Sequence, residues 1–312
     1  MRFRVLRVIC LFSFLVSSGF AQQASHSPAP APGSAADLVQ RGQKLSREGK
    51  QDEALALYDQ ALDKAPDSYE AHLQSGVALD LKGEYAKAQE EFTKAISAAN
   101  EESKPQAFRA MAFSYAFAGD AYKAADFEMQ VLNPLLAKGD SVGAAATCNE
   151  LARIYLELGD PDHAYKWYKM GYDTVSRKTD LPETDKNLWL FRWESAQARI
   201  AVRRGNADEA KRHVTAAKAA LDKANNPNQA QFYPYIVGYV AFYAGDYKAA
   251  ISELQKADQH DPFILVLLGQ AYEKSGDAAQ AKDYYRKVLD INFHNPTNAF
   301  ARPLAKKKLE GS

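Results

Sequence analysis

The sequence is poor in cysteine and has no excess of charge of either sign. It contains two cysteines, Cys10 and Cys148, and 17 glycines among 312 residues. Lysine and arginine total 39, as do aspartate and glutamate, so the charge balance gives no indication of a nucleic-acid partner. With so few disulfide candidates the fold must rest on a hydrophobic core, which a chain of this length can form.

Catalytic and metal-binding motifs are also missing. The six histidines are spread along the chain, and none forms a metal-ligand pair on one helix face. There is no glycine-rich phosphate loop, and Cys148 is expected to be a buried, inert thiol. We therefore predict no enzymatic activity, no cofactor and no metal site. A site assembled from residues distant in sequence would leave no such motif.

Residues 1–21 have the features of a signal peptide. Arginines precede a short apolar run from Val8 to Val16, and small residues precede a cleavage position after Ala21. The run is too short for a comfortable membrane span, although an uncleaved anchor is an alternative. Cleavage would leave Cys148 alone, so the mature chain would have no internal disulfide. The signal is bacterial in style, so we expect an exported, periplasmic protein, with membrane association left open.

Residues 22–34, "QQASHSPAPAPGS", lack large apolar side chains and alternate proline with alanine. Such a segment buries too little surface to offset its ordering entropy. We predict a disordered, extended tether.

A unit of apolar helix, glycine and second helix recurs along the rest of the chain. The marker glycines are Gly49, Gly83, Gly119, Gly159, Gly205, Gly245 and Gly276. Five residues after each comes an alanine: Ala54, Ala88, Ala124, Ala164, Ala210, Ala250 and Ala281. A glycine can adopt a left-handed conformation and end a helix, and an alanine lets two helices approach closely. Repeats of this size are typical of a helical solenoid.

Bulky residues complete the unit one helical turn after the alanine. They are Tyr58, Phe92, Tyr168, Leu254 and Tyr285. The first unit reads Leu38, Gly42, Leu45, Gly49, Ala54, Tyr58, Ala61 and Pro66. This pattern resembles the tetratricopeptide repeat. The resemblance implies an all-α, right-handed superhelical solenoid of about seven helix-turn-helix repeats over residues 35–292, followed by a capping helix and tail at residues 293–312.

The middle units depart from the pattern. The marker glycines lie between 31 and 46 residues apart. Residues 175–187 predict a loop and a new helix start, and the fifth unit is expected to have a long first helix. In the third unit, Glu128 occupies the position where an aromatic residue is expected.

Helical periodicity selects side chains of the first helices that face away from the core positions. They are Arg109, Phe113, Phe117, Asn149, Arg153, Arg192, Arg199, Arg203, Tyr235, Tyr239, Phe242 and Tyr243. In the resembling family, ligands usually lie on this concave surface, so we predict a peptide-binding groove that is basic in the middle and aromatic at one end. The alternative is that these side chains only pack on neighbouring helices or pair with glutamates of adjacent repeats.

The resemblance therefore implies a non-enzymatic scaffold that binds an extended peptide or a partner protein in the concave groove. The family's carboxylate clamp is not reproduced, because Asn149 and Arg153 match it only in part. The alternative function is an accessory or assembly factor of an envelope enzyme, secretion or outer-membrane complex. Neither the partner's identity nor the oligomeric state follows from the sequence.

Overall fold

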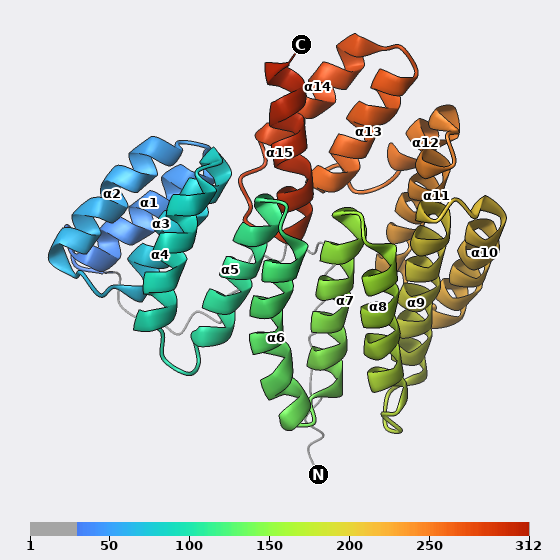
Figure 1. The fold of residues 1–312 in the computed structure, drawn as a ribbon, viewed down its shortest axis with the longest axis horizontal. Helices are drawn as coiled ribbons and strands as arrows, with labels where there is room; N and C mark the ends of the chain where they lie inside the picture. Colours follow the sequence, from blue (N-terminus) through green and yellow to red (C-terminus); the bar gives the residue numbers. More distant parts are fainter. Residues whose placement is uncertain (1–29, 312) are drawn as a thin grey trace.

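A computed structural model describes residues 30–311 (Figure 1). The predicted signal peptide and most of the predicted tether lie outside the described residues. Within the described range the chain forms fifteen α-helices and one short 3-10 helix, with no strand. The prediction of an all-α fold is confirmed.

Fourteen of the helices form seven consecutive antiparallel pairs (Figure 1). The pairs are α1 (Ala35–Arg47) with α2 (Gln51–Lys64), α3 (Tyr69–Lys82) with α4 (Tyr85–Ala98), α5 (Lys104–Phe117) with α6 (Ala121–Ala137), α7 (Ser141–Glu157) with α8 (Pro161–Ser176), α9 (Glu183–Arg203) with α10 (Ala207–Ala224), α11 (Phe232–Tyr243) with α12 (Tyr247–Leu254), and α13 (Pro262–Lys274) with α14 (Ala278–Leu289). The short helix η1 (Pro227–Gln229) precedes α11, and α15 (Pro296–Glu310) ends the described chain. The long first helix predicted for the fifth unit is confirmed by the 21 residues of α9.

The marker glycines end the first helix of each pair. All seven have a positive φ, between +79° and +101°, which an L-amino acid with a side chain rarely adopts. Aspartates after several of these glycines cap the next helix: Asp120 accepts a hydrogen bond from the backbone N–H of Lys123, and Asp246 from that of Ala249. The glycine thus reverses the chain and the following residue starts the second helix.

Small residues allow the two helices of a pair to pack closely. The seven predicted alanines are at most 2% exposed. In the second pair, a Cβ added to Gly76 would lie 2.6 Å from the ring of Phe92, which leaves no room for a side chain. The bulky residue of the second helix therefore packs directly on the backbone of the first.

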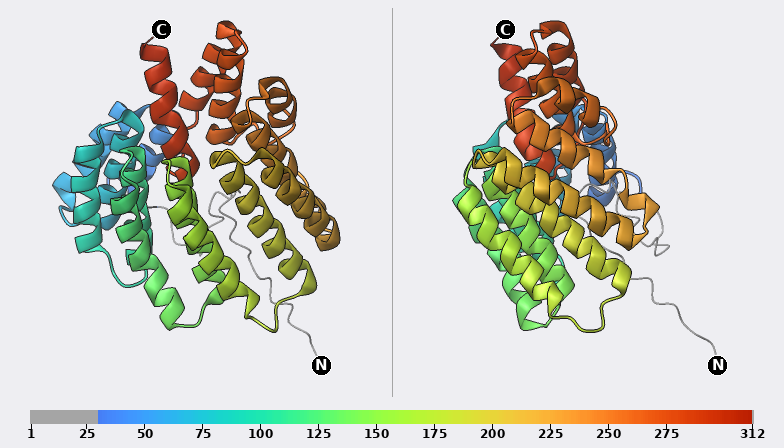
Figure 2. Two further views of the ribbon diagram at one scale, coloured as in Figure 1. Left: turned by 45° about the vertical axis from the view of Figure 1, so that its right-hand side comes forward. Right: turned by 90° about the vertical axis from the view of Figure 1, so that its right-hand side faces the viewer.

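The last helix turns back toward earlier repeats. Figures 1 and 2 show α15 beside α13 and α14, and also beside α5 of the third repeat. The predicted capping helix is therefore present, and it closes the superhelix as well as covering its last pair. The helix runs through Pro303 to Glu310. Among the described helices, none is long and apolar enough to cross a membrane.

Candidate protein-binding groove

The twelve predicted groove residues lie on α5, α7, α9 and α11, the first helices of the third to sixth repeats. Seven are buried, and their exposed fractions are 9% or less: Phe113, Phe117, Arg153, Arg199, Tyr235, Tyr239 and Phe242. The other five are partly exposed: Arg109, Asn149, Arg192, Arg203 and Tyr243. Hydrogen bonds and ring contacts join six of these residues, from α7, α9 and α11, into one cluster: Arg153, Arg199, Arg203, Tyr235, Tyr239 and Tyr243. Arg109 and Arg192 lie outside it.

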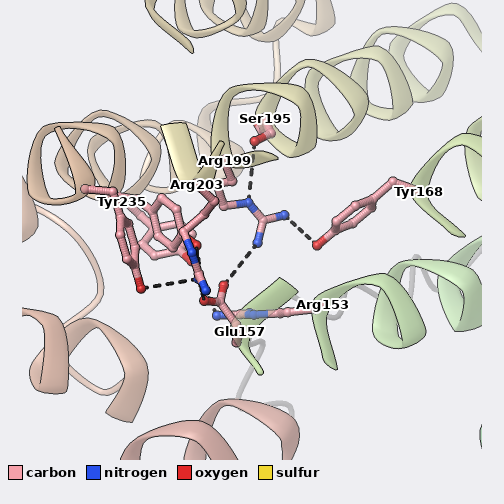
Figure 3. A network of polar contacts seen from close by, with 9 residues as sticks. Arg153, Glu157, Tyr168, Ser195, Arg199, Arg203 and Tyr235 are labelled. Carbon is pink, nitrogen blue, oxygen red and sulfur yellow. Dashed lines mark hydrogen bonds and ion pairs between the residues drawn. The ribbon is translucent and has the colours of Figure 1, made fainter. Parts of the chain in front are cut away.

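A buried carboxylate is at the centre of this cluster (Figure 3). Glu157, the last residue of α7, has a side chain that is 1% exposed. Its Oε2 accepts hydrogen bonds from Arg203 Nη1 and from the Tyr239 hydroxyl, each at 3.1 Å. Its Oε1 lies 3.9 Å from Arg199 Nη1. We call these residues, with the partners described next, the Glu157 network; it joins three successive repeats.

Arg199 is almost completely enclosed in this network. Its Nη2 donates to the Tyr168 hydroxyl at 2.8 Å, and its Nε donates to the Ser195 carbonyl at 3.4 Å (Figure 3). Burial acts to lower the pKa of Arg199, but the surrounding tyrosines and Glu157 raise it above its ordinary value. The guanidinium therefore stays charged in the interior, where its charge is offset by Glu157.

Arg153 occupies the other side of the cluster. Its Nη2 donates to the Tyr235 hydroxyl at 3.5 Å, and its guanidinium carbon lies 5.3 Å from the centre of the Phe263 ring. Asp261 caps the start of α13 by accepting from the Phe263 N–H. Burial raises the pKa of Asp261 to about 6, although Arg153 acts to lower it. These contacts connect the fourth repeat to the seventh.

The two arginines outside the cluster also have partners within the chain. Arg109 Nε lies 3.1 Å from Glu150 Oε2, and Arg192 stacks 4.2 Å from the centre of the Trp189 ring. The sequence left open the alternative that these arginines pair with glutamates of adjacent repeats. Arg109 does so with Glu150, and Arg203 with Glu157. Within the network, Arg153, Arg199 and Tyr239 are at most 3% exposed. They could reach a ligand only after the network rearranged, because neighbouring repeats enclose their side chains.

A hollow of about 340 Å³ remains open on the inner face. It lies between α5, α7, α11, α13 and α15, and its lining includes Phe117, Tyr243, Phe263, Val266, Gln270 and Leu304. Of the predicted groove residues, Phe117 and Tyr243 reach it. The sequence reasoning missed the residues of α13, although Phe263, Val266 and Gln270 have the spacing of one helix face. It also missed α15, whose position depends on tertiary contacts.

The described part of the chain offers little support for a metal site or for a reactive cysteine. No group of three or more histidine, cysteine, aspartate or glutamate side chains there could hold a metal ion. Cys148 is completely buried, and this burial raises the pKa of its thiol to about 12. A thiol in this environment is a poor nucleophile.

Comparison with solved structures shows the same architecture. A tetratricopeptide repeat protein from Parabacteroides merdae ATCC 43184 is 15% identical, with a TM-score of 0.51 over 88% of this chain and 97% of the other. The apo form of RapI is 10% identical, with a TM-score of 0.56 over 89% of this chain and 99% of the other. At these identities the likeness concerns the fold. A search of curated proteins gave no match.

Family models agree with the repeat pattern. Four models described as "Tetratricopeptide repeat" match residues 39–107, 147–181, 194–214 and 264–295, together about half of the chain. These segments include parts of the first to fifth helix pairs and of the seventh. The chain belongs to the tetratricopeptide repeat family.

Proposed function

We propose that this protein is a non-enzymatic scaffold that binds a polypeptide segment of a partner protein on its concave face. The observation that carries the proposal is the hollow of about 340 Å³ between α5, α7, α11, α13 and α15. Apart from α15, the helices around it are first helices, which line the inner side of such a solenoid. Its volume is in the range of a small-molecule or side-chain pocket.

The lining of the hollow favours apolar and aromatic side chains of the partner. Phe117, Phe263 and Leu304 provide apolar walls, and Tyr243 and Gln270 add polar groups. Burying one large apolar side chain contributes about 1.5–3 kcal/mol, whereas an exposed ion pair contributes about 0.2–1 kcal/mol. We expect the apolar contacts to set affinity, and the partly exposed Arg203 at the edge of the network to affect orientation.

A variant that fills the hollow tests the proposal. Gln270→Trp places a bulky side chain at the lining, and Gln280→Trp makes the same change at an exposed position of α14 in the same repeat. Proteins from an exported fraction would be captured on the wild-type chain and on both variants, then quantified by mass spectrometry. We expect specific partners to be lost with Gln270→Trp and retained with Gln280→Trp. Equal recovery on all three chains would refute binding at this hollow, provided that circular dichroism and melting are unchanged.

We also propose that the protein acts outside the cytoplasm, after export. The support is the basic start, short apolar run and small residues of the first 21 residues. Fractionation of cells that express the tagged full chain tests this: the mature protein should appear in the periplasmic fraction and be shorter by the length of the signal peptide. A full-length product that remains in the cytoplasm would contradict it.

A further inference from the structure

The C-terminal segment packs on the last helix pair and, on the inner side of the solenoid, also meets earlier repeats. Besides α14, helix α15 contacts α5, α7 and α13, three first helices that belong to different repeats. The loop that precedes α15 contacts the first repeat, where Gln51 Nε2 donates to Asn292 Oδ1 at 3.5 Å. Figure 1 shows α15 bridging the space between the early and the late repeats.

The segment is held at one end of α3 by basic side chains. Arg302 Nε donates to the Leu81 carbonyl at 2.7 Å, and Lys306 Nζ donates to the Lys82 carbonyl at 3.1 Å. The last carbonyls of a helix have no partner within the helix and carry partial negative charge. Arg302 Nη1 also donates to the Leu289 carbonyl at the end of α14, at 2.9 Å. One guanidinium therefore joins the C-terminal ends of two helices from distant repeats.

A buried carboxylate provides a second attachment point. Asp80 of α3 has a side chain that is 0% exposed, and its Oδ2 lies 2.8 Å from His294 Nε2 in the loop before α15. Its Oδ1 accepts from the Ser114 hydroxyl at 2.9 Å. The His294 ring lies 5.4 Å from the Phe117 ring, centre to centre, in a stacked arrangement. The early repeats thus offer a carboxylate, helix carbonyls and an aromatic wall, which together suit a basic segment.

The composition of α15 matches this surface. The sequence "PTNAFARPLAKKKLE" carries Arg302 and three lysines but only one acid, Glu310. On its apolar side, the Phe300 ring packs against the Phe263 ring at 6.1 Å in an edge-to-face arrangement. At the far end, Lys308 Nζ pairs with Glu273 Oε1 at 2.7 Å. The surface under α15 therefore contacts both the basic and the apolar side chains of this helix.

We propose that this inner surface is a receptor site for a short basic amphipathic helix, and that α15 occupies it in cis as a displaceable latch. The inference rests on the proposed function, since it names the kind of partner segment that the concave face accepts. A partner that presents a similar helix competes with α15. The tethered helix has an effective concentration on the order of millimolar, so only a segment of higher intrinsic affinity opens the latch.

A peptide added in trans tests the receptor site without any cellular partner. The probe is a fluorescein-labelled peptide of residues 293–310, and the receptor is the full chain with Arg302→Ala, which weakens its own latch. We expect this variant to bind the probe at least about tenfold more tightly than the wild-type chain does in fluorescence anisotropy. A probe that itself carries Arg302→Ala should bind the variant more weakly. Equal binding of both probes, or no binding by the variant, would overturn the proposal.

Two controls keep the result interpretable. Lys307→Ala changes an exposed lysine of the same helix, and this variant should bind the probe no better than the wild type. If Arg302→Ala fails to fold, hydrogen exchange of the wild-type chain decides: amides of α15 should exchange through a local opening, faster than those of α5 and α13. Exchange of α15 only by global unfolding would exclude a latch. Because neither measurement uses a captured partner, failure here is distinguishable from failure of the Gln270→Trp experiment.

Discussion

Replacing Glu128 with leucine should stabilise the protein. Glu128 lies on α6 at the repeat position that holds Tyr58 and Phe92 in the first two pairs. Its side chain is 0% exposed, and within residues 30–311 neither carboxylate oxygen accepts a hydrogen bond. Burial, followed by the nearby Glu150, raises its pKa well above the ordinary value, while Arg109 acts to lower it. The third repeat thus carries a carboxyl group where the other repeats pack an apolar one.

The expected gain is about 1–2 kcal/mol. Leaving a buried polar group without a hydrogen bond costs about 1–3 kcal/mol, and Glu128→Leu removes this penalty while keeping a similar volume. Against this, Arg109 loses one of its two acidic neighbours. Its pair with Glu150 remains at 3.1 Å, and the Arg109 side chain is 35% exposed, so the loss should be in the range of an exposed pair, about 0.2–1 kcal/mol.

The gain should depend on pH in a defined direction. A glutamate has a pKa of about 4.3 in an unfolded chain, and that of Glu128 is higher in the folded state. The folded state therefore binds the proton more tightly. This contribution to wild-type stability is fully present below about pH 4.3 and is lost as pH rises toward the folded-state pKa. Glu128→Leu removes this contribution. The advantage of the variant should be largest at neutral pH and shrink toward pH 4.

Urea unfolding followed by circular dichroism at several pH values would measure the effect. Glu90→Leu, at an exposed position of α4, is the matched control and should change stability by less than about 0.5 kcal/mol. A Glu128→Leu variant that is less stable than the wild type at pH 7, or one whose gain is constant with pH, would refute the reasoning.

Four further changes have expected outcomes that melting or urea unfolding can check. Ala88→Leu overfills a helix crossing at a 0% exposed position and should cost about 1–3 kcal/mol; an unchanged unfolding curve would contradict the packing. Gly83→Ala forces a side chain into a backbone with φ +92° and should cost about 1–2 kcal/mol, whereas a neutral result would indicate that the turn relaxes. Glu157→Gln leaves Arg199 buried without its counter-charge and should cost about 3–5 kcal/mol. The raised pKa of Asp261 predicts that wild-type stability falls as pH rises from about 4 to about 6. Asp261→Asn should remove this pH dependence.

The sequence predicted the repeats well because their signals are local. Each marker glycine needs only its own backbone conformation to end a helix, and all seven have the expected positive φ. The alanine and the bulky residue of each second helix are separated by one helical turn, so their packing also follows from periodicity. The unusual length of α9 could be expected from the spacing of the same glycines.

The candidate site was harder to predict. Periodicity indicates the direction in which Arg199 points, but its burial depends on Tyr168 and Glu157, which come from the preceding repeat. The position of α15 depends on contacts such as that between Asp80 and His294, which are 214 residues apart. No local pattern encodes such a contact, because it arises only when the curvature of all seven pairs brings the ends together.

The contact between Asp80 and His294 affects how the chain can fold. In an open array of repeats, each unit depends only on its neighbours, and the ends can unravel independently. Here the second repeat is completed by residues close to the C-terminus, so its buried aspartate acquires its second partner only after almost the whole chain has been synthesised. Pairing of residues so distant in sequence is a slow step in folding. Shortening the chain by its last twenty residues would therefore weaken the beginning of the molecule as well as its end.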